Sequence, residues 1–210
     1  MKIAIDLQVC QSEETAFRGI GRYSLDFAKA VISNFDKKHE FLAILNQSLQ
    51  NRQGHIQQTL GLPQLHYRYL VGNSLFPDIH AQRRFYSRLQ NHLYASEQCE
   101  VVHNSSIFEY APQHIPHFFP ASTERIYSAT LYDLIPLRMK DRYLSNRDSL
   151  NWYLEYTRSL ERQNILLAIS EATRKEALEL LHLRDDQVVN ISSAVDPDKF
   201  YVETIPEDLR

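Results

Sequence analysis

The sequence predicts an α/β protein with a doubly wound, mainly parallel sheet of about seven strands. Three observations predict this fold class. Short apolar runs alternate with amphipathic stretches along nearly the whole chain. Several runs are continuously apolar, as expected of strands that helices cover on both faces. Polar residues or glycines follow these runs, which is where open parallel sheets bind their ligands.

The composition is that of an ordinary globular protein. The 210 residues are 43% hydrophobic and 23% charged, with a net charge of −3. A chain of this length buries roughly 70% of its unfolded surface in one large domain. The charge balance argues against a nucleic-acid partner. No stretch is apolar for long enough to span a membrane. Cys10 and Cys99 lack metal-ligand spacing and fit small buried side chains in the reducing cytoplasm.

The first strand–helix–strand unit is the clearest. Residues 3–7 are predicted to form an apolar strand, and residues 41–45 a second one. Between them, a helix is predicted over about residues 21–34. Its apolar stripe consists of Tyr23, Phe27, Ala30 and Val31. The turn at 18–24 contains two of the five glycines, so it suits either a close-packed turn or the approach of an anion to a helix N-terminus.

The next part of the chain gives a weaker signal. Residues 46–73 are polar and rich in glutamine, apart from a plausible third strand at 65–71. Pro77 can begin a helix that runs to about Ser96. The basic face of this helix carries Arg83, Arg84 and Arg88. Such a face is either solvated or placed against an anionic membrane surface.

Residues 99–104 are predicted as a fourth strand, and residues 108–122 as a proline-rich loop. His114 and His117 in this loop resemble a metal pair only superficially, because no helix aligns them and no third ligand is evident. Two surface histidines are the simpler interpretation. No metal site is therefore predicted.

The last third of the chain repeats the alternation. Strands are predicted at 126–132, 164–169 and 188–192, with a long helix at about 147–163. Ser170 is a suitable N-cap for one more helix. An acidic tail follows the last strand and is predicted to be a linker.

The sheet topology would bring several polar residues to one edge. The glycine turn, His103, Asp133 and Ser170 all follow predicted strands, so a Rossmann-like strand order would gather them in one crevice. A dinucleotide site is disfavoured, since Arg22-Tyr23-Ser24 replaces the third glycine of the Gly-x-Gly-x-x-Gly pattern.

With these elements placed, the chain resembles the N-terminal half of a GT-B-fold glycosyltransferase of family 4. This retaining family includes bacterial polysaccharide mannosyltransferases. The resemblance covers nearly the whole chain. It is carried by residues 2–6 with 17–23, by 130–136, by 167–174, and by 188–192 with Val195, Asp196 and Phe200.

The sequence departs from the family pattern in three ways. Tyr132 stands where the family often has histidine, so a histidine's role does not transfer to it. Ser193 and Ala194 stand where Asn-Gly is common. The family's second domain, with the paired glutamates that meet the nucleotide sugar, is absent from these 210 residues.

The resemblance implies a hexosyltransferase domain that is inactive alone. Residues 1–196 would be a Rossmann-like acceptor-binding domain, and 197–210 a linker towards a C-terminal donor-binding domain. The full enzyme would move sugar from a nucleoside-diphosphate sugar to a glycan or lipid-linked acceptor in polysaccharide biosynthesis, without a cofactor. Its expected location is the cytoplasm, with contact at the inner face of the membrane left open.

The resemblance also implies roles for individual residues. Asp133 would be catalytic, orienting or deprotonating an acceptor hydroxyl. The residues that would face the donor diphosphate are Gly19, Gly21, Arg18 and Arg22. The acceptor pocket would contain His103, Ser105, Tyr132, Ser170 and Glu171.

Other interpretations stay open. Asp133 suits a turn cap, and Ser170 suits a helix cap. The alternative for the whole chain is a non-catalytic Rossmann-like module that binds a phosphorylated ligand.

Overall fold

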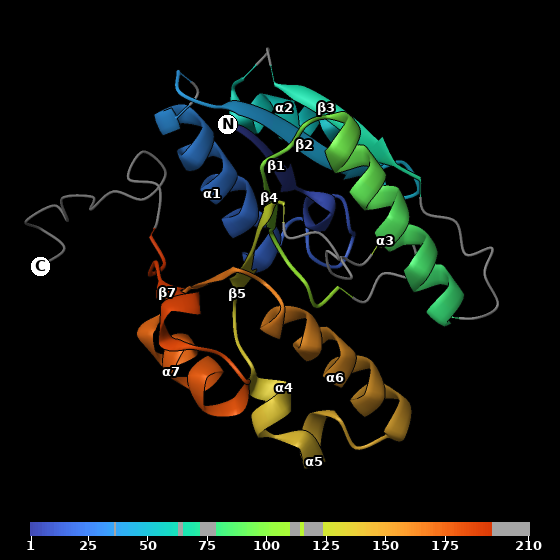
Figure 1. Ribbon diagram of the computed structural model, residues 1–210, viewed down its shortest axis with the longest axis vertical. Helices are drawn as coiled ribbons and strands as arrows, with labels where there is room; N and C mark the ends of the chain where they lie inside the picture. The colour runs from blue at the N-terminus through green and yellow to red at the C-terminus, as the bar shows by residue number, and fades with distance from the viewer. Residues whose placement is uncertain (36, 63–64, 72–78, 110–113, 116–123, 195–210) are drawn as a thin grey trace, which may run out of the picture.

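A computed structural model describes residues 1–35, 37–62, 65–71, 79–109, 114–115 and 124–194, with the backbone alone for 79–84. It contains one seven-stranded sheet in which every pair of neighbouring strands is parallel, in the order β3-β2-β1-β4-β5-β6-β7. The predicted Rossmann-like, doubly wound fold is confirmed (Figure 1). The strands are β1 (Lys2–Asp6), β2 (Glu40–Asn46), β3 (His66–Leu70), β4 (Val101–Asn104), β5 (Ile126–Leu131), β6 (Ile165–Ala168) and β7 (Val188–Asn190).

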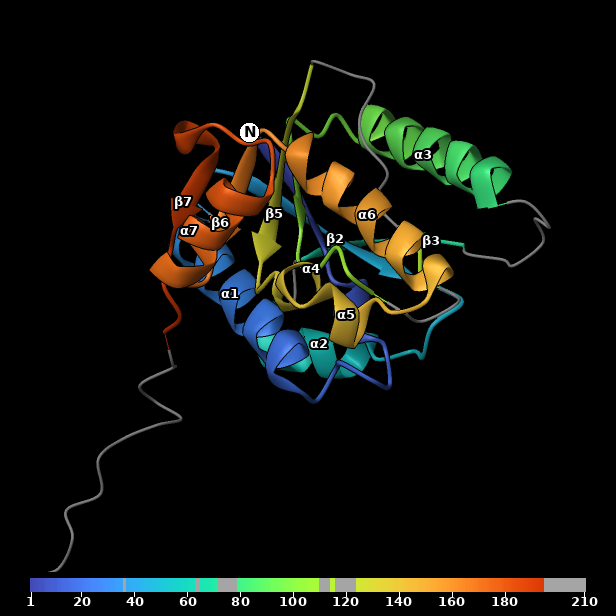
Figure 2. The same cartoon turned by 90° about the horizontal axis from the view of Figure 1, so that it is seen from below.

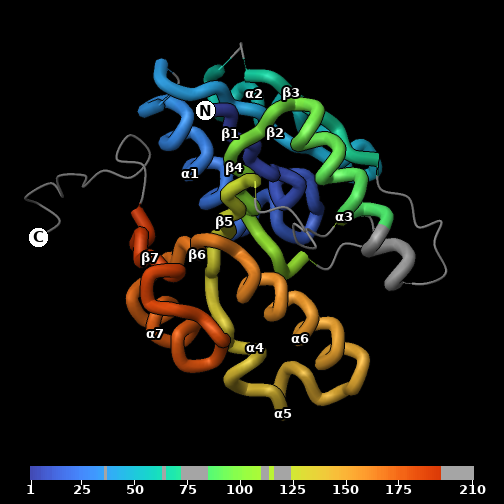
Figure 3. The backbone as a smooth tube through the Cα atoms, in the orientation of Figure 1, coloured from blue at the N-terminus to red at the C-terminus, as the bar shows by residue number. Residues whose placement is uncertain are grey.

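The strand order reverses beside β1. This strand pairs with β2 on one side and β4 on the other, so that Asp6 lies between Ile44 and Asn104. The chain leaves β1 towards β2 and β3, then crosses back to β4 and continues to β7, as Figure 3 traces from blue to red. A reversal of this kind opens a crevice at the carboxyl ends of the strands.

The helices cover both faces of the sheet. The longer helices are α1 (Gly19–Phe35), α2 (Gln53–Leu60), α3 (Ile79–Ser96), α6 (Arg147–Glu161) and α7 (Glu171–Leu180). The short ones are η1 (Gln8–Cys10), α4 (Ile135–Arg138), α5 (Lys140–Tyr143) and η2 (Asp185–Gln187). Figure 2 shows α1 and α2 on one side of the sheet, and α3 and α6 on the other.

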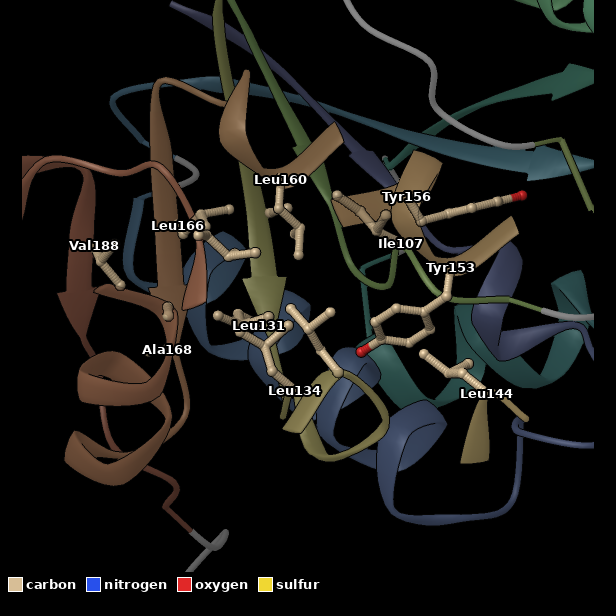
Figure 4. Packing of buried hydrophobic residues seen from close by; sticks show 14 residues of the cluster. Ile107, Leu131, Leu134, Leu144, Tyr153, Tyr156, Leu160, Leu166, Ala168 and Val188 are labelled. Carbon is tan, nitrogen blue, oxygen red and sulfur yellow. The ribbon is translucent and has the colours of Figure 1, made fainter. Parts of the chain in front are cut away.

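Alternation along the strands explains this division. Ile5 and Ala43 belong to the apolar cluster under α1 and α2, whereas the neighbouring Ala4 and Leu42 belong to the cluster with α3. Successive side chains of a strand point to opposite faces. A third cluster joins β5, β6 and β7 to α4, α6 and α7, and Figure 4 shows its side chains gathered over the strands. The core is therefore two apolar layers that share one sheet.

Local differences from the sequence prediction have physical causes. Helix α1 begins at Gly19, so both glycines lie in its first turn rather than before it. Helix α2 was not predicted, because only Ile56 and Leu60 are buried among its eight residues. Gly61 ends α2 in the left-handed region at φ 65°, where glycine is favoured. Helices α4 and α5 have four residues each, too few for a helical period to appear in the sequence.

Several predictions fall outside the described residues. These are the helix start at Pro77, the side chains of Arg83 and Arg84, most of the 108–122 loop, and the linker at 197–210. Arg88 of the same basic face is exposed. In the described part of the chain, no helix has both the length and the apolar character needed to cross a membrane.

Candidate functional site

The loop between β1 and α1 closes on itself before the helix begins. The Thr15 carbonyl oxygen accepts hydrogen bonds from the N–H groups of Arg18, at 2.9 Å, and Gly21, at 3.2 Å. A Cβ on Gly21 would lie 2.4 Å from that oxygen, so the turn packs here only with glycine. Gly19 is exposed, and no atom of the described residues outside its own turn lies within 4 Å of its would-be Cβ. The close-packed turn therefore explains Gly21, and Gly19 offers the open approach.

Two cations lie at the start of α1, Arg18 just before the helix and Arg22 in its first turn. Arg18 and Arg22 are both exposed, and neither forms an ion pair within the described residues. The N–H groups of a first helical turn lack partners within the helix and carry partial positive charge. In α1 the N–H groups of Gly21 and Arg22 are bonded to the carbonyl oxygens of Thr15 and Arg18, which leaves those of Gly19 and Ile20 to meet an anion. Arginine adds planar donors that match a phosphate geometrically. This end of α1 is suited to an anion.

His103 lies away from this helix end, on the sheet face that α1 covers. Its Nδ1 is 2.9 Å from the Ser128 hydroxyl, and its Nε2 is 3.2 Å from the Thr130 hydroxyl. The Phe27 ring packs on it with centroids 5.1 Å apart. Because both ring nitrogens have partners on β5, the structure places His103 in a satisfied polar core rather than at the strand ends.

Tyr132 connects the end of β5 to the first turn of α1. Its hydroxyl lies 2.8 Å from the Ser24 hydroxyl and 3.4 Å from the carbonyl oxygen of Ile20. The Tyr23 ring meets it edge-on, with centroids 5.6 Å apart. Burial raises the pKa of Tyr132 far above its usual value, so it stays a neutral hydroxyl. Its polar atom is engaged by the protein itself.

Asp133 is exposed just beyond Tyr132. Its Oδ1 accepts a hydrogen bond from the N–H of Ile135 at 3.1 Å, at the start of α4. This contact is the turn cap that the sequence left open. The second carboxylate oxygen has no partner in the described part of the chain. Asp133 can therefore cap the turn and still accept a hydrogen bond from a ligand.

Ser170 and Glu171 belong to the start of α7. The Ser170 hydroxyl accepts from the N–H of Thr173 at 3.1 Å, so it acts as an N-cap. Glu171 accepts from Asn190 Nδ2 at 3.3 Å and lies 3.6 Å from Arg174. The Thr173 hydroxyl donates to the Tyr132 carbonyl oxygen at 3.0 Å. The ends of β5, β6 and β7 thus form one hydrogen-bonded group.

A buried polar network at the switch point was not predicted. Gln8 donates through Nε2 to Asp6 Oδ2 at 2.7 Å and accepts from Asn46 Nδ2 at 2.9 Å. Its Oε1 also accepts from the N–H of Ile115 at 3.0 Å. All three polar side chains are almost wholly buried. The signal in the sequence was an acid and an amide placed directly after an apolar strand.

Glu109 is the second residue that sequence reasoning missed. It is only 4% exposed, and its Oε2 lies 3.4 Å from the Thr15 hydroxyl. Burial, assisted by Asp6 and Glu14, raises the pKa of its carboxyl to about 7, against contacts with the Ser106 and Thr15 hydroxyls that lower it. An acid in the predicted proline-rich loop gave no sign of burial, because burial depends on residues far away in sequence.

Within the described residues, three buried polar atoms at or shortly after the end of β4 have no hydrogen-bond partner. They are Asn104 Oδ1, Ser105 Oγ and Glu109 Oε1. Buried polar atoms are nearly always paired, so these three atoms are exceptions. Ser105 is the predicted acceptor-pocket residue among them.

The structure tests the prediction of two surface histidines at one of the two positions. His114 is buried at 6% exposure, which corrects the prediction of a surface histidine, and His117 lies outside the described residues. Cys10 and Cys99 are unpaired and buried, as predicted. Within the described ranges, no group of three histidine, cysteine or acidic side chains is placed to hold a metal ion.

Comparison with known proteins shows that this chain is similar to part of a longer protein. The chain is 27% identical to the serotype-specific mannosyltransferase WbdA of Escherichia coli over 93% of this chain and 24% of that protein. A further match to a protein of that name is 34% identical over 38% of this chain and 10% of the relative. The chain thus spans about a quarter of the length of the first of these relatives. No family model matches.

A solved structure supports the fold. A Listeria monocytogenes protein described as a UDP-N-acetylglucosamine 2-epimerase superposes with a TM-score of 0.51 and 10% identity, over 89% of this chain and 43% of that chain. At this identity the likeness concerns the Rossmann-like architecture alone.

Proposed function

We propose that this chain is the acceptor-binding domain of a retaining, family 4-type hexosyltransferase of polysaccharide biosynthesis. The observation that carries the proposal is the similarity to a mannosyltransferase over 93% of the chain. The enzyme would transfer a sugar from a nucleoside-diphosphate sugar to a glycan or lipid-linked acceptor. The open helix end beside the strand ends supplies chemistry suited to that donor.

The donor site of the proposed enzyme is divided between two domains. Residues 1–196 form the domain proposed here, 197–210 a linker, and a second domain binds most of the nucleotide sugar. The small share of the relative that the chain spans leaves ample length for such a domain. Buried, unpaired cysteines agree with a cytoplasmic location, and contact with the inner face of a membrane is part of the same proposal.

The first turn of α1 would receive the diphosphate. Gly19 allows close approach, and the N–H groups of Gly19 and Ile20 would point towards the ligand, because those of Gly21 and Arg22 are bonded to Thr15 and Arg18. Arg22, with Arg18 beside it, supplies positive charge to the leaving diphosphate. Preorganised donors of this kind stabilise negative charge that develops in the transition state. Gly21 contributes indirectly, because it lets the preceding turn pack.

Asp133 would orient the acceptor hydroxyl through its second carboxylate oxygen. Ser105, after the end of β4, is only 1% exposed, so it would support the acceptor surface from beneath rather than touch the sugar. Tyr132 and Ser170 support this surface through contacts within the protein. In this scheme Asp133 is a hydrogen-bond acceptor or base and forms no covalent bond with the sugar.

The test uses the longer protein that contains this chain, with sugar transfer from labelled nucleoside-diphosphate sugars as the readout. Asp133→Asn keeps the oxygen that accepts from Ile135 but removes the charge, whereas Asp133→Ala removes both. We expect both variants to lose about 100-fold or more in kcat, as for loss of a proton-accepting group. Normal turnover in Asp133→Asn together with failure of Asp133→Ala would reduce Asp133 to a turn cap.

The isolated chain makes a second test. It should fold but transfer no sugar, and calorimetry should show weak binding of nucleoside-diphosphate sugars. Tight binding without transfer, in the longer protein as well, would favour the non-catalytic module instead.

A further inference from the structure

Glu109 is a buried acid that connects the strand-end polar group to the turn before α1. It lies five residues beyond the end of β4, and its contact with Thr15 spans 94 positions of sequence. Within the described residues its Oε1 has no hydrogen-bond partner, and its Oε2 lies 3.4 Å from the Thr15 hydroxyl. The Ser106 hydroxyl also interacts with the carboxyl group. Nothing in the proposed transfer reaction uses this residue.

The two contacts of the Thr15 hydroxyl favour a protonated Glu109 carboxyl. A threonine hydroxyl has one proton to donate. The Val9 carbonyl oxygen lies 2.9 Å from the Thr15 hydroxyl and can only accept, while Glu109 Oε2 lies 3.4 Å away. The shorter contact takes the Thr15 proton. The Glu109 contact is then a hydrogen bond only if the carboxyl is protonated and donates to the Thr15 oxygen.

The surroundings of Glu109 agree with a neutral acid. Asp6 of β1 and Glu14 of the loop act on it as acids that disfavour its charge. The weak acids near it, Cys10 of η1 and Tyr132 beyond β5, stay neutral because burial raises their pKa values. An added negative charge would meet like charge on two sides in a poorly solvated place.

Thr15 transmits this contact to α1. Its carbonyl oxygen accepts from the N–H groups of Arg18 and Gly21, and it packs against the face of Gly21 that lacks a Cβ. Any shift of Thr15 therefore moves the backbone that begins α1.

We propose that neutral Glu109 is a positioning residue that holds the Thr15 turn, and with it the first turn of α1, and that loss of its proton releases this turn. The assignment of that turn to a donor diphosphate rests on the proposed function. The hydrogen-bond coupling between Glu109, Thr15 and Gly21 does not.

The coupling can be measured without a substrate by NMR on the chain labelled with ¹³C in glutamate and ¹⁵N in the backbone. The Glu109 carboxyl carbon is identified as the resonance missing from Glu109→Gln. We expect it to titrate near pH 7, and the Thr15 and Gly21 amides to shift with the same midpoint. In Glu109→Gln these two amides should be independent of pH and resemble the low-pH wild type.

Two variants of Thr15 complete the test if Glu109→Gln does not fold. Thr15→Ser keeps the hydroxyl, so the Gly21 amide should still follow Glu109. Thr15→Val keeps the shape but lacks the oxygen, so the Gly21 amide should no longer follow. Titration of Glu109 near pH 4.5, or an unchanged Gly21 amide while Glu109 titrates near 7, would overturn the proposal.

A kinetic readout then connects the coupling to transfer. In the longer protein, kcat/KM for the donor should fall as pH rises through about 7 in the wild type and lose this inflection in Glu109→Gln. A coupling seen by NMR in a protein that transfers no sugar would reject the proposed function and keep the positioning role. Sugar transfer without the NMR coupling would support the proposed function and reject the positioning role of Glu109.

Discussion

A single hydroxyl contact joins β5 to α1. The hydroxyls of Tyr132 and Ser24 lie 2.8 Å apart although they are 108 positions apart in sequence, and Ser24 is only 1% exposed. Removing one partner of a buried pair leaves the other unsatisfied, which costs about 1–3 kcal/mol. The pair therefore contributes to stability independently of any ligand.

We predict that Tyr132→Phe lowers the free energy of unfolding by about 1–2 kcal/mol. Ser24→Ala should lower it similarly, and the double variant should be less destabilised than the sum of the two single variants. Urea unfolding of all four proteins gives the interaction energy. Strict additivity would show that the two hydroxyls do not interact.

The pKa of Glu109 predicts how stability depends on pH. Its carboxyl pKa is raised from 4.5 to about 7 by folding, so the folded state holds the proton more strongly than the unfolded state. The stabilisation of the folded state by this stronger proton binding is complete below pH 4.5 and is lost as pH rises towards 7. The full loss is roughly 3 kcal/mol at 1.36 kcal/mol per pKa unit.

Glu109→Gln is neutral at every pH and should lack this loss. We expect the difference in unfolding free energy between Glu109→Gln and wild type to grow in favour of the variant by roughly 3 kcal/mol from pH 4 to pH 8. Measuring denaturation curves at several pH values tests this. A constant difference would mean that the carboxyl titrates alike in both states.

At the scale of elements, the start of α1 depends on one of its two glycines. The would-be Cβ of Gly21 lies 2.4 Å from the Thr15 oxygen and 2.6 Å from the Ala16 oxygen, both backbone atoms. Gly19 has open space at the same point of its backbone. Gly19 can therefore serve as the control for Gly21, because both begin α1 and only Gly21 is tightly packed.

Gly21→Ala should destabilise the protein by more than 1 kcal/mol, because the turn must shift to admit a methyl group. Gly19→Ala should be neutral or stabilising by up to about 1 kcal/mol. Thermal unfolding of both variants gives the comparison. In the longer protein, Gly19→Ala should impair donor binding more than it impairs stability, since it narrows the open approach.

At the scale of the whole molecule, all apolar clusters share one sheet. Leu42 lies in the cluster with α3 and Leu166 in the cluster with α6 and α7, and both are completely buried. Continuous pairing from β3 to β7 connects the two regions. We expect them to unfold together.

Leu42→Ala and Leu166→Ala should each cost about 2–5 kcal/mol. Unfolding is followed by circular dichroism and by the fluorescence of Trp152, the single tryptophan. For each variant, the two methods should show the same decrease in the unfolding midpoint. Trp152 packs against the cluster that contains Leu166. If Leu42→Ala moved the circular dichroism transition and left the fluorescence transition in place, the domain would contain two separate folding units.

The sequence predicted the architecture better than the site. Continuous apolar runs identified the strands, and a helical period identified α1 and α6. The same reasoning missed α2, whose outer surface is polar and whose buried residues are too few to show a period. It placed Ser170 as a cap, which the structure bears out. Buried contacts made by His103 and Glu109 had no local signature.

The sequence by itself determined the strand–helix alternation, the parallel sheet and the polar residues at the strand ends, because periodicity and end residues are local properties of the chain. The tertiary structure alone decided which of those residues are engaged by the protein and which remain open. His103 is satisfied by β5, Tyr132 by α1, and Glu109 by a turn 94 positions away. Burial and hydrogen bonding between distant segments depend on how strands are ordered in space. The hydrophobic pattern of one segment does not show which other segments will pack against it.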